Sequence, residues 1–271
     1  MMKQKPTIGI VLSGGGVRGV AHAGVFKALE ESGIRIDQLS GSSAGAMAGA
    51  LYAAGYSPED ILEFFKTNAH NIFQWRHFAR SKPGILDSDQ YAELFEPWLK
   101  GHTFKTLSRK LYICVTDVLK GKVRFFSSGE LVRPILASAA MPGVFTPVEI
   151  GENWYIDGGT MNNFPVEPLM GKCDILLGSY VSMKKEVEKS ELSSTLQLLN
   201  RASDLSYLEI SLHKFKTCDL VFAPTELWQY GIFDVKKIEE IYQAGYDHAC
   251  SRMGSLKEIL SSRAPGARRA S

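Results

Sequence analysis

The chain has few cysteines, and none of them lies close to another in the sequence. Four occur among 271 residues, and no two have the C-x-x-C spacing. Structural zinc sites need closely paired ligands, and disulfide-stapled secreted domains are shorter and richer in cysteine. We therefore expect neither a structural zinc site nor a disulfide framework. We interpret all four cysteines as ordinary thiols of a protein from a reducing compartment: Cys114, Cys173, Cys218 and Cys250.

Excess charge and long apolar runs are also missing. The formal net charge is +2, and basic blocks are absent apart from an arginine-bearing tail, 263–271, which we expect to be disordered. This balance gives no reason to expect a nucleic-acid partner. The apolar run near the N-terminus is too short for a signal peptide, and no run is long enough for a membrane span. These absences favour a cytoplasmic protein.

Strand-like and helix-like segments alternate in the first third of the chain. The apolar run 7–13 predicts a buried strand, and 20–33 has apolar residues at helical spacing and ends at a glycine. Segment 34–39 predicts a second strand, and the small-residue segment 44–55 predicts a second helix. This order indicates a parallel sheet with right-handed crossovers.

The rest of the chain continues as strands and helices with no repeat or linker, which favours one α/β fold. Lys120 and Gly121 lie between two strand-like runs and predict a hairpin, and Ser57 followed by Pro58 predicts a helix start. Further helices are expected at 86–99, 130–143, 191–215 and 234–260, and further strands at 153–157, 174–181 and 218–224.

A glycine-rich loop, residues 13–19 (SGGGVRG), follows the first predicted strand. Its backbone N–H groups lie beside the positive end of a helix, so they suit a pyrophosphate or a transient oxyanion equally well. Gly14, Gly16 and Gly19 also fit the dinucleotide fingerprint, with Asp37 near the end of the next predicted strand at about the expected separation. A glycine turn needed only for tight packing is the third interpretation.

Two adjacent serines stand between a predicted strand and a predicted helix. Only the frame bounded by Gly41 and Gly45 fits the pattern G-x-S-x-G, which makes Ser43 the candidate nucleophile and Ser42 a spacer. The flanking glycines lack the Cβ atoms that would clash in such a sharp turn, and the helix dipole favours negative charge on the serine oxygen. The alternative is a packing turn whose serine caps the helix.

Asp157, Gly158 and Gly159 end another predicted strand. Such a motif is often only a turn former. As a catalytic base, Asp157 would sit on a rigid strand with no bulky neighbour between it and Ser43. Alone the motif favours a turn, but together with the glycine loop and the serine turn it completes the parts of a serine hydrolase.

In this order, the three motifs resemble those of the patatin-like phospholipase family. GGGVRG corresponds to its oxyanion motif, GSSAG to its nucleophile motif and DGG to its dyad motif, and 137–166 is similar to the family's stretch around the aspartate. The resemblance covers 7–170 by motif and continues more weakly through 171–262. It points to the small bacterial, neuropathy-target-esterase-like branch.

The resemblance implies a three-layer α/β/α fold with a mostly parallel central sheet, in which 7–170 carries the catalytic motifs and 171–262 completes the same fold. It implies a serine esterase acting on lipid acyl esters such as phospholipid, lysophospholipid or acylglycerol. Transient contact with a membrane surface is expected, and neither a metal nor a cofactor is implied. The oligomeric state stays open.

Catalysis, by the same resemblance, would use a dyad of Ser43 and Asp157 and an acyl-enzyme intermediate. Because a carboxylate with an ordinary pKa of about 3.9 is a weak base, burial would have to raise the pKa of Asp157. The N–H groups of Gly15 and Gly16 would stabilise the oxyanion, and Arg18 would brace the loop or add positive potential.

A Ser-Asp-His triad remains the alternative for the same chemistry. His213 or His248 would complete it, because serine, acid and histidine then follow the α/β-hydrolase order. Both histidines lie in helical patterns, whereas a triad histidine usually comes from a loop. We interpret His22, in the first predicted helix, as structural.

Segment 61–78 is rich in aromatic residues. It suits an acyl channel or a membrane contact, but core packing is the interpretation we favour, because apolar residues at helical spacing are mostly core. The aromatic residues are Phe64, Phe65, Phe73, Trp75 and Phe78.

Overall fold

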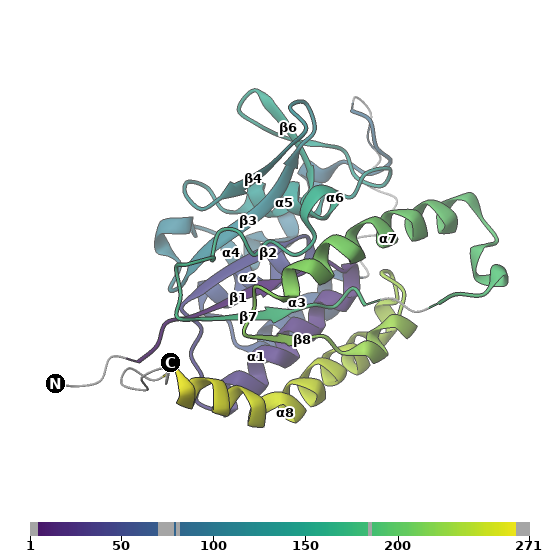
Figure 1. Cartoon of the computed structure of the whole chain (residues 1–271). Coiled ribbons are helices and arrows are strands. Elements are labelled where there is room, and N and C mark those ends of the chain that lie inside the picture. Colours follow the sequence, from purple (N-terminus) through teal and green to yellow (C-terminus); the bar gives the residue numbers. More distant parts are fainter. Residues whose placement is uncertain (1–4, 70–78, 80–81, 184–185, 264–271) are drawn as a thin grey trace.

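A computed structural model describes residues 5–69, 79, 82–183 and 186–263. Within them the chain forms an eight-stranded sheet with the order β5-β6-β3-β2-β1-β7-β8, and β4 pairs with β3 beside this path (Figure 1). The strands are β1 (Ile8–Leu12), β2 (Gln38–Ser42), β3 (Lys110–Asp117), β4 (Lys122–Phe126), β5 (Val148–Ile150), β6 (Asn153–Asp157), β7 (Ile175–Ser179) and β8 (Leu220–Phe222).

Five of these strands, β3, β2, β1, β7 and β8, are parallel neighbours, whereas β4, β5 and β6 pair antiparallel. The mostly parallel α/β sheet is therefore confirmed, and so is the hairpin around Lys120 and Gly121. The helices are α1 (Ala21–Glu31), α2 (Ala44–Ala54), α3 (Pro58–Ala69), α4 (Glu96–Leu99), α5 (Val132–Ala139), α6 (Gly159–Asn162), α7 (Thr195–Phe215) and α8 (Ile238–Ser262).

Alternate side chains of β1 point to opposite faces of the sheet, and each face packs into its own apolar cluster. Ile10 and Leu12 belong to the larger cluster, to which α1, α2, α3, α5 and α8 contribute. Val11 belongs to the smaller cluster, against which Phe215 of α7 packs. Helices thus cover both faces of the sheet, as expected of three layers.

Two glycines allow α1 and α8 to meet backbone to backbone, and Figure 1 shows α8 running alongside α1. A Cβ atom on Gly24 of α1 would lie 2.6 Å from the backbone nitrogen of Tyr246, and one on Gly245 of α8 would lie 2.8 Å from the Cα of Ala21. Any side chain at either position would separate the helices. This contact fixes the C-terminal helix directly behind the glycine loop, because α1 follows that loop.

The second strand differs from its prediction: it begins at Gln38 and not at residue 34. Asp37 is the reason, because its carboxylate accepts the N–H of Ile8 at 2.9 Å, a donor that a strand neighbour would otherwise use. The strand therefore starts only after Asp37. Both Ile34 and Ile36 are nevertheless buried, so the apolar pattern reported burial correctly and strand pairing incorrectly.

The single helix predicted over 86–99 is also wrong. The structure has a 3-10 helix, η3 (Ser88–Leu94), followed by the short α4. Pro97 explains the interruption, because proline lacks the N–H that would continue a helix and its ring clashes with the preceding turn. A second 3-10 helix, η1 (Gly16–Val20), precedes α1. The other 3-10 helices within the described residues are η4 (Phe104–Thr106), η5 (Lys189–Leu192), η6 (Thr225–Gln229) and η7 (Val235–Lys237).

Candidate active site

The three motifs meet at the carboxyl edge of the parallel strands. The glycine loop follows β1, and Ser43 follows the neighbouring parallel strand β2. Asp157 arrives from the opposite direction, as the last residue of β6, and pairs with Val115 of β3. Because β3 is the other neighbour of β2, this antiparallel return brings the aspartate to the serine.

Ser43 has φ 51° and ψ −124°, and among the described residues other than glycine it alone has a positive φ. Its carbonyl oxygen accepts the N–H groups of Ala46 and Met47, which begins α2, but its side chain caps nothing. A Cβ atom on Gly45 would lie 2.5 Å from the carbonyl oxygen of Leu12. The turn is therefore strained and pressed against β1, and the capping interpretation of Ser43 is wrong.

The hydroxyl of Ser43 donates a hydrogen bond of 2.7 Å to Oδ2 of Asp157. The other carboxylate oxygen, Oδ1, accepts the N–H of Gly159, also at 2.7 Å. Burial raises the pKa of Asp157 to about 6, although both hydrogen bonds act to lower it. By contrast, Ser42 is fully buried, and its hydroxyl has no partner among the described residues.

Ser138, near the end of α5, supports both halves of this pair and was not among the residues predicted from the sequence. Its Oγ accepts the N–H of Ser43 at 2.8 Å and donates to the carbonyl oxygen of Cys114 at 2.6 Å. Its carbonyl oxygen accepts the N–H of Gly158 at 3.2 Å. A serine among alanines in a helical pattern carries no signal of such a role, so only the fold reveals it.

The glycine loop presents two N–H groups without partners among the described residues, those of Gly15 and Gly16. The N–H of Gly14 donates to the carbonyl oxygen of Asn163 at 3.2 Å. Gly16 has φ +59° and lines the cavity beside Ser43. Arg18 is buried, and its Nε donates to the carbonyl oxygen of Gly15 at 3.2 Å, so it braces the loop from the protein interior.

The other glycines of the motifs allow close approach. Gly19 faces the Cβ of Ala44, and Gly158 faces the carbonyl oxygen of Cys114, each without room for a side chain. Gly41 would place a Cβ 2.5 Å from the carbonyl oxygen of Gly45. Each glycine therefore lets one part of the site lie directly on another.

A buried polar network holds the glycine loop from behind. Nε2 of His22 donates to the carbonyl oxygen of Ser13 at 2.9 Å, because a carbonyl can only accept, so Nδ1 accepts the hydroxyl of Ser179 at 2.7 Å. Burial lowers the pKa of His22 to about 4, which keeps the ring neutral. The hydroxyl of Ser182 donates to the carbonyl oxygen of Gly14 at 2.6 Å. His22 thus contacts the loop and not the dyad.

The triad alternative finds no support in the described part of the chain. His213 is exposed on α7, and Nε2 of His248 accepts the N–H of Ala223 at 3.1 Å. No described histidine bonds to Ser43 or Asp157, which contact each other directly. His70 and His77 lie outside the described residues.

The dinucleotide alternative is wrong because Asp37 precedes β2 and does not follow it. It therefore lies at the amino edge of the sheet, opposite the glycine loop at the carboxyl end of β1. A ribose-binding acid would have to stand at the carboxyl edge, beside the loop.

An apolar cavity opens beside Ser43 and Asp157. It encloses about 1050 Å³ of empty space, its open mouth included, between α2, α3, η3, α5 and the segment 232–235. Phe64 and Phe65 are buried and line it, so these two aromatic residues are both core and cavity wall. Phe73, Trp75 and Phe78 lie outside the described residues, as does the tail after residue 263.

The described residues contain no group of three or more His, Cys, Asp or Glu side chains placed to hold a metal ion. In the same ranges, every helix is too short or too polar to cross a membrane. All four cysteines are free thiols, of which Cys114 is buried.

Comparisons with known proteins agree with the motifs. Residues 10–170 match the family model for patatin-like phospholipase. The chain is 28% identical over 284 aligned positions to lysophospholipase nte1 of Neurospora crassa, across 93% of this chain and 18% of that protein. It is 32% identical over 166 positions to an uncharacterised NTE family protein of Mycobacterium bovis, across 61% of this chain and 46% of that one. The chain thus spans less than a fifth of the fungal relative.

Solved structures share the fold at low identity. Human GIVD cytosolic phospholipase A2 has a TM-score of 0.56 at 9% identity, covering 95% of this chain and 60% of that one. VipD from Legionella pneumophila has a TM-score of 0.54 at 14% identity, covering 96% and 67%. These likenesses support the three-layer fold and nothing finer.

Proposed function

Because the chain belongs to the patatin-like phospholipase family, we propose that it hydrolyses lipid acyl esters with Ser43 as nucleophile and Asp157 as base. The observation that carries the proposal is the 2.7 Å hydrogen bond from the Ser43 hydroxyl to Asp157, at an apolar cavity. A serine hydroxyl is a poor nucleophile until a neighbouring base takes its proton. Asp157 is the acceptor already in contact with it.

In the first half of the reaction, Ser43 Oγ attacks the ester carbonyl carbon while its proton passes to Asp157. The carbonyl oxygen becomes an oxyanion, for which the N–H groups of Gly15 and Gly16 are available donors. The tetrahedral intermediate collapses, the alcohol leaves with the proton from Asp157, and the acyl group stays on Ser43. The Ser138 hydroxyl accepts the Ser43 N–H, and this hydrogen bond helps to keep the strained turn in its conformation during the reaction.

In the second half, water attacks the acyl-enzyme. Asp157 accepts a proton from the water, the new tetrahedral intermediate uses the same glycine donors, and the proton returns to Ser43 as the fatty acid leaves. Burial assists this role, because a carboxylate with a pKa of about 6 is a stronger base than an exposed aspartate. The steps require neither a metal ion nor a cofactor.

The apolar cavity supports an acyl chain as the group bound beside Ser43. We infer a lysophospholipid or another singly acylated lipid as the substrate, since the apolar cavity adjoins Ser43 and a curated relative is a lysophospholipase. Phe233 lines the cavity and is 40% exposed, so the cavity wall continues onto the surface. We propose that this rim touches the membrane transiently when a lipid enters.

The experiment that tests this function combines turnover with labelling. The purified protein is incubated with lysophosphatidylcholine, phosphatidylcholine or monoacylglycerol in mixed micelles, and the released fatty acid is quantified. In parallel an alkyl fluorophosphonate, which reacts with activated serines, is added and the adduct is located by mass spectrometry. We expect fatty acid release and an adduct on Ser43. An adduct on Ser43 without release of fatty acid would support Ser43 as the nucleophile but contradict the lipid substrate. Absence of both adduct and release would overturn the proposal.

The pH dependence of ester hydrolysis should follow the protonation of Asp157. Protonated Asp157 cannot accept the serine proton, so kcat/KM is expected to fall tenfold for each pH unit below about 6 and to level off above about 7. The measurement uses a soluble p-nitrophenyl ester, with circular dichroism at each pH as the control for folding. A folded enzyme whose activity persisted down to about pH 4, the ordinary aspartate value, would contradict the assignment of Asp157 as a buried base.

A further inference from the structure

One wall of the cavity is a segment of irregular backbone, residues 82–95, which we call the strap. It contains η3, and its side chains Ser88, Tyr91 and Phe95 line the cavity. The ring of Tyr91 meets the ring of Phe145 edge-on, with centroids 5.1 Å apart. Because the backbone hydrogen bonds of a 3-10 helix have poor geometry, contacts with neighbouring elements decide where this wall stands.

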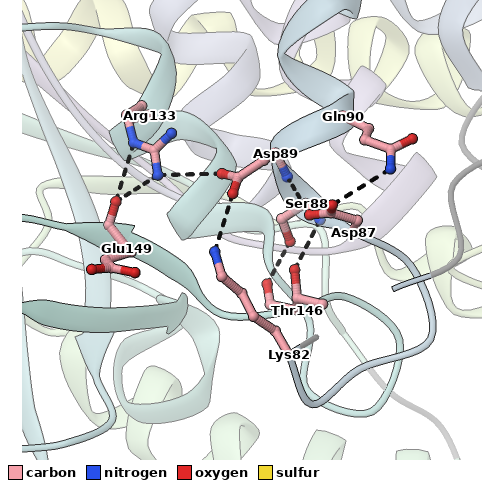
Figure 2. Close-up of polar contacts among 8 residues, drawn as sticks. All are labelled: Lys82, Asp87, Ser88, Asp89, Gln90, Arg133, Thr146 and Glu149. Atoms are coloured by element: carbon pink, nitrogen blue, oxygen red, sulfur yellow. Dashed lines mark hydrogen bonds and ion pairs between the residues drawn. The ribbon is translucent and has the colours of Figure 1, made fainter. Parts of the chain in front are cut away.

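Hydrogen bonds attach the strap to the loop between α5 and β5. The N–H groups of Ile85 and Leu86 donate to the carbonyl oxygen of Val144 at 3.0 and 2.8 Å. The N–H of Ser88 donates to Oγ1 of Thr146, and the Ser88 hydroxyl donates to the Thr146 carbonyl oxygen, as Figure 2 shows. These bonds fix the strap as far as Ser88, the first residue of η3, and side-chain contacts position the residues that follow.

Asp89 supplies that positioning with two ion pairs (Figure 2). Its Oδ2 lies 3.1 Å from Nζ of Lys82, and its Oδ1 lies 3.2 Å from Nη2 of Arg133. Arg133 is itself held, because its guanidinium donates twice to the carbonyl oxygen of Glu149, at 3.1 and 2.6 Å. Asp89 therefore joins η3 to α5 and, through Arg133, to β5.

This junction spans the cavity, because α5 forms another part of its wall. Leu136 and Ala140 of the α5 region line the cavity, and Ser138 of the same helix holds the N–H of Ser43. The Asp89–Arg133 pair thus sets the distance between the strap and the helix that supports the nucleophile. Its two side chains are 37% and 42% exposed, so the pair is too weak to be needed for folding and is suited to adjusting position.

We propose that Asp89, through Arg133, fixes the width of the acyl cavity and so determines which acyl chains the enzyme accepts. The inference rests on the proposed function, in which this cavity receives the acyl chain. Asp89 is a positioning residue, since it contacts the wall and not the substrate. Loss of its charge frees η3 to move away from α5, which widens the cavity for long chains while leaving the dyad in place.

The test compares acyl-chain preference in wild type and Asp89→Asn. We measure kcat/KM for p-nitrophenyl butanoate, octanoate, dodecanoate and hexadecanoate. The butanoate value is expected to stay within about twofold, while the ratio of dodecanoate to butanoate rises by about threefold or more. Arg133→Gln should shift the ratio in the same direction, and the double variant should shift it no further than the larger single effect. Asp89→Glu, which keeps the carboxylate, should return the ratio toward wild type.

Arg35→Gln is the matched control. Arg35 also forms a partly exposed ion pair, with 3.8 Å between its Nε and Oδ1 of Asp37, and neither residue lines the cavity or lies on a helix that does. Its ratio should equal that of wild type. An unchanged ratio in folded Asp89→Asn would overturn the proposal.

A binding measurement separates this inference from the proposed function. Displacement of a fluorescent fatty acid by octanoate and by dodecanoate reports the cavity without any turnover. If no ester is hydrolysed, the proposed function fails, and a changed displacement ratio in Asp89→Asn still supports the role of Asp89. Equal displacement ratios in Asp89→Asn and wild type would overturn it.

Discussion

Replacing Ser43 by alanine is expected to lower kcat/KM for every ester substrate by roughly 10⁴- to 10⁶-fold, the range seen when a catalytic serine is removed. Without the hydroxyl no acyl-enzyme forms, and the glycine loop alone can only stabilise a rare attack by water. Alanine also fits the turn, because it adds nothing to the side chain already there. The measurement is p-nitrophenyl butanoate hydrolysis at high enzyme concentration, together with loss of the fluorophosphonate adduct.

Asp157→Asn should lower kcat/KM by a similar factor. The substitution removes the negative charge while keeping the shape of the side chain. The amide keeps the volume of the carboxyl group, and its oxygen and nitrogen can still bond to the Gly159 N–H and to Ser43. Only the ability to accept a proton is lost.

Two variants serve as controls for the dyad. Ser42→Ala removes the adjacent hydroxyl, which has no partner among the described residues, and should retain activity within about threefold. His213→Ala combined with His248→Ala should also retain activity, because neither ring contacts the dyad in the structure. Loss of activity in a folded histidine variant, or full activity in Ser43→Ala, would contradict the mechanism.

Gly245→Ala is expected to destabilise the protein by about 3 kcal/mol, the upper end of the usual cost of overpacking a core. The added methyl carbon would lie 2.8 Å from the Cα of Ala21 and would overlap its carbonyl group. All of these neighbours are backbone atoms, so no side chain can rotate to make room. The measurement is urea denaturation, where the midpoint should fall while the slope stays constant.

The same helix offers a matched control in Gly254. A Cβ atom there meets no atom within 4 Å, so Gly254→Ala should stabilise the protein by up to about 1 kcal/mol through helix propensity alone. The two substitutions are chemically identical and are expected to have opposite signs. Equal effects would show that α1 and α8 adjust their separation freely, against the close contact described here.

Local patterns predicted the elements well where one segment carries its own signal. The apolar run of β1, the small residues of α2 and the Lys120-Gly121 turn each depend on neighbours within a few positions. The pairing of Ser43 with Asp157, 114 residues apart, was also predictable, because both lie in glycine motifs tied to one chemistry. Motifs of this kind are readable since few residues other than glycine fit them.

Features that depend on distant partners and lie in no motif could not be predicted from the sequence. The start of β2 is set by the bond from the Ile8 N–H to Asp37, which no local pattern reports. Ser138 and Asp89 are ordinary polar residues until the fold places them beside Ser43 and Arg133. Their roles come from positions in space that many other sequences could supply.

The late position of β7 has a consequence for how the protein is made. This strand pairs with the whole of β1, and it carries or directly precedes the hydroxyl groups of Ser179 and Ser182, which hold the glycine loop. A ribosome that has released only the first 170 residues has delivered Ser43 and Asp157 but not these supports. Because pairing across such a separation forms late, the glycine loop reaches its final shape only after most of the chain has been synthesised. A chain of that length therefore contains both Ser43 and Asp157, but not yet the residues that hold the glycine loop in place.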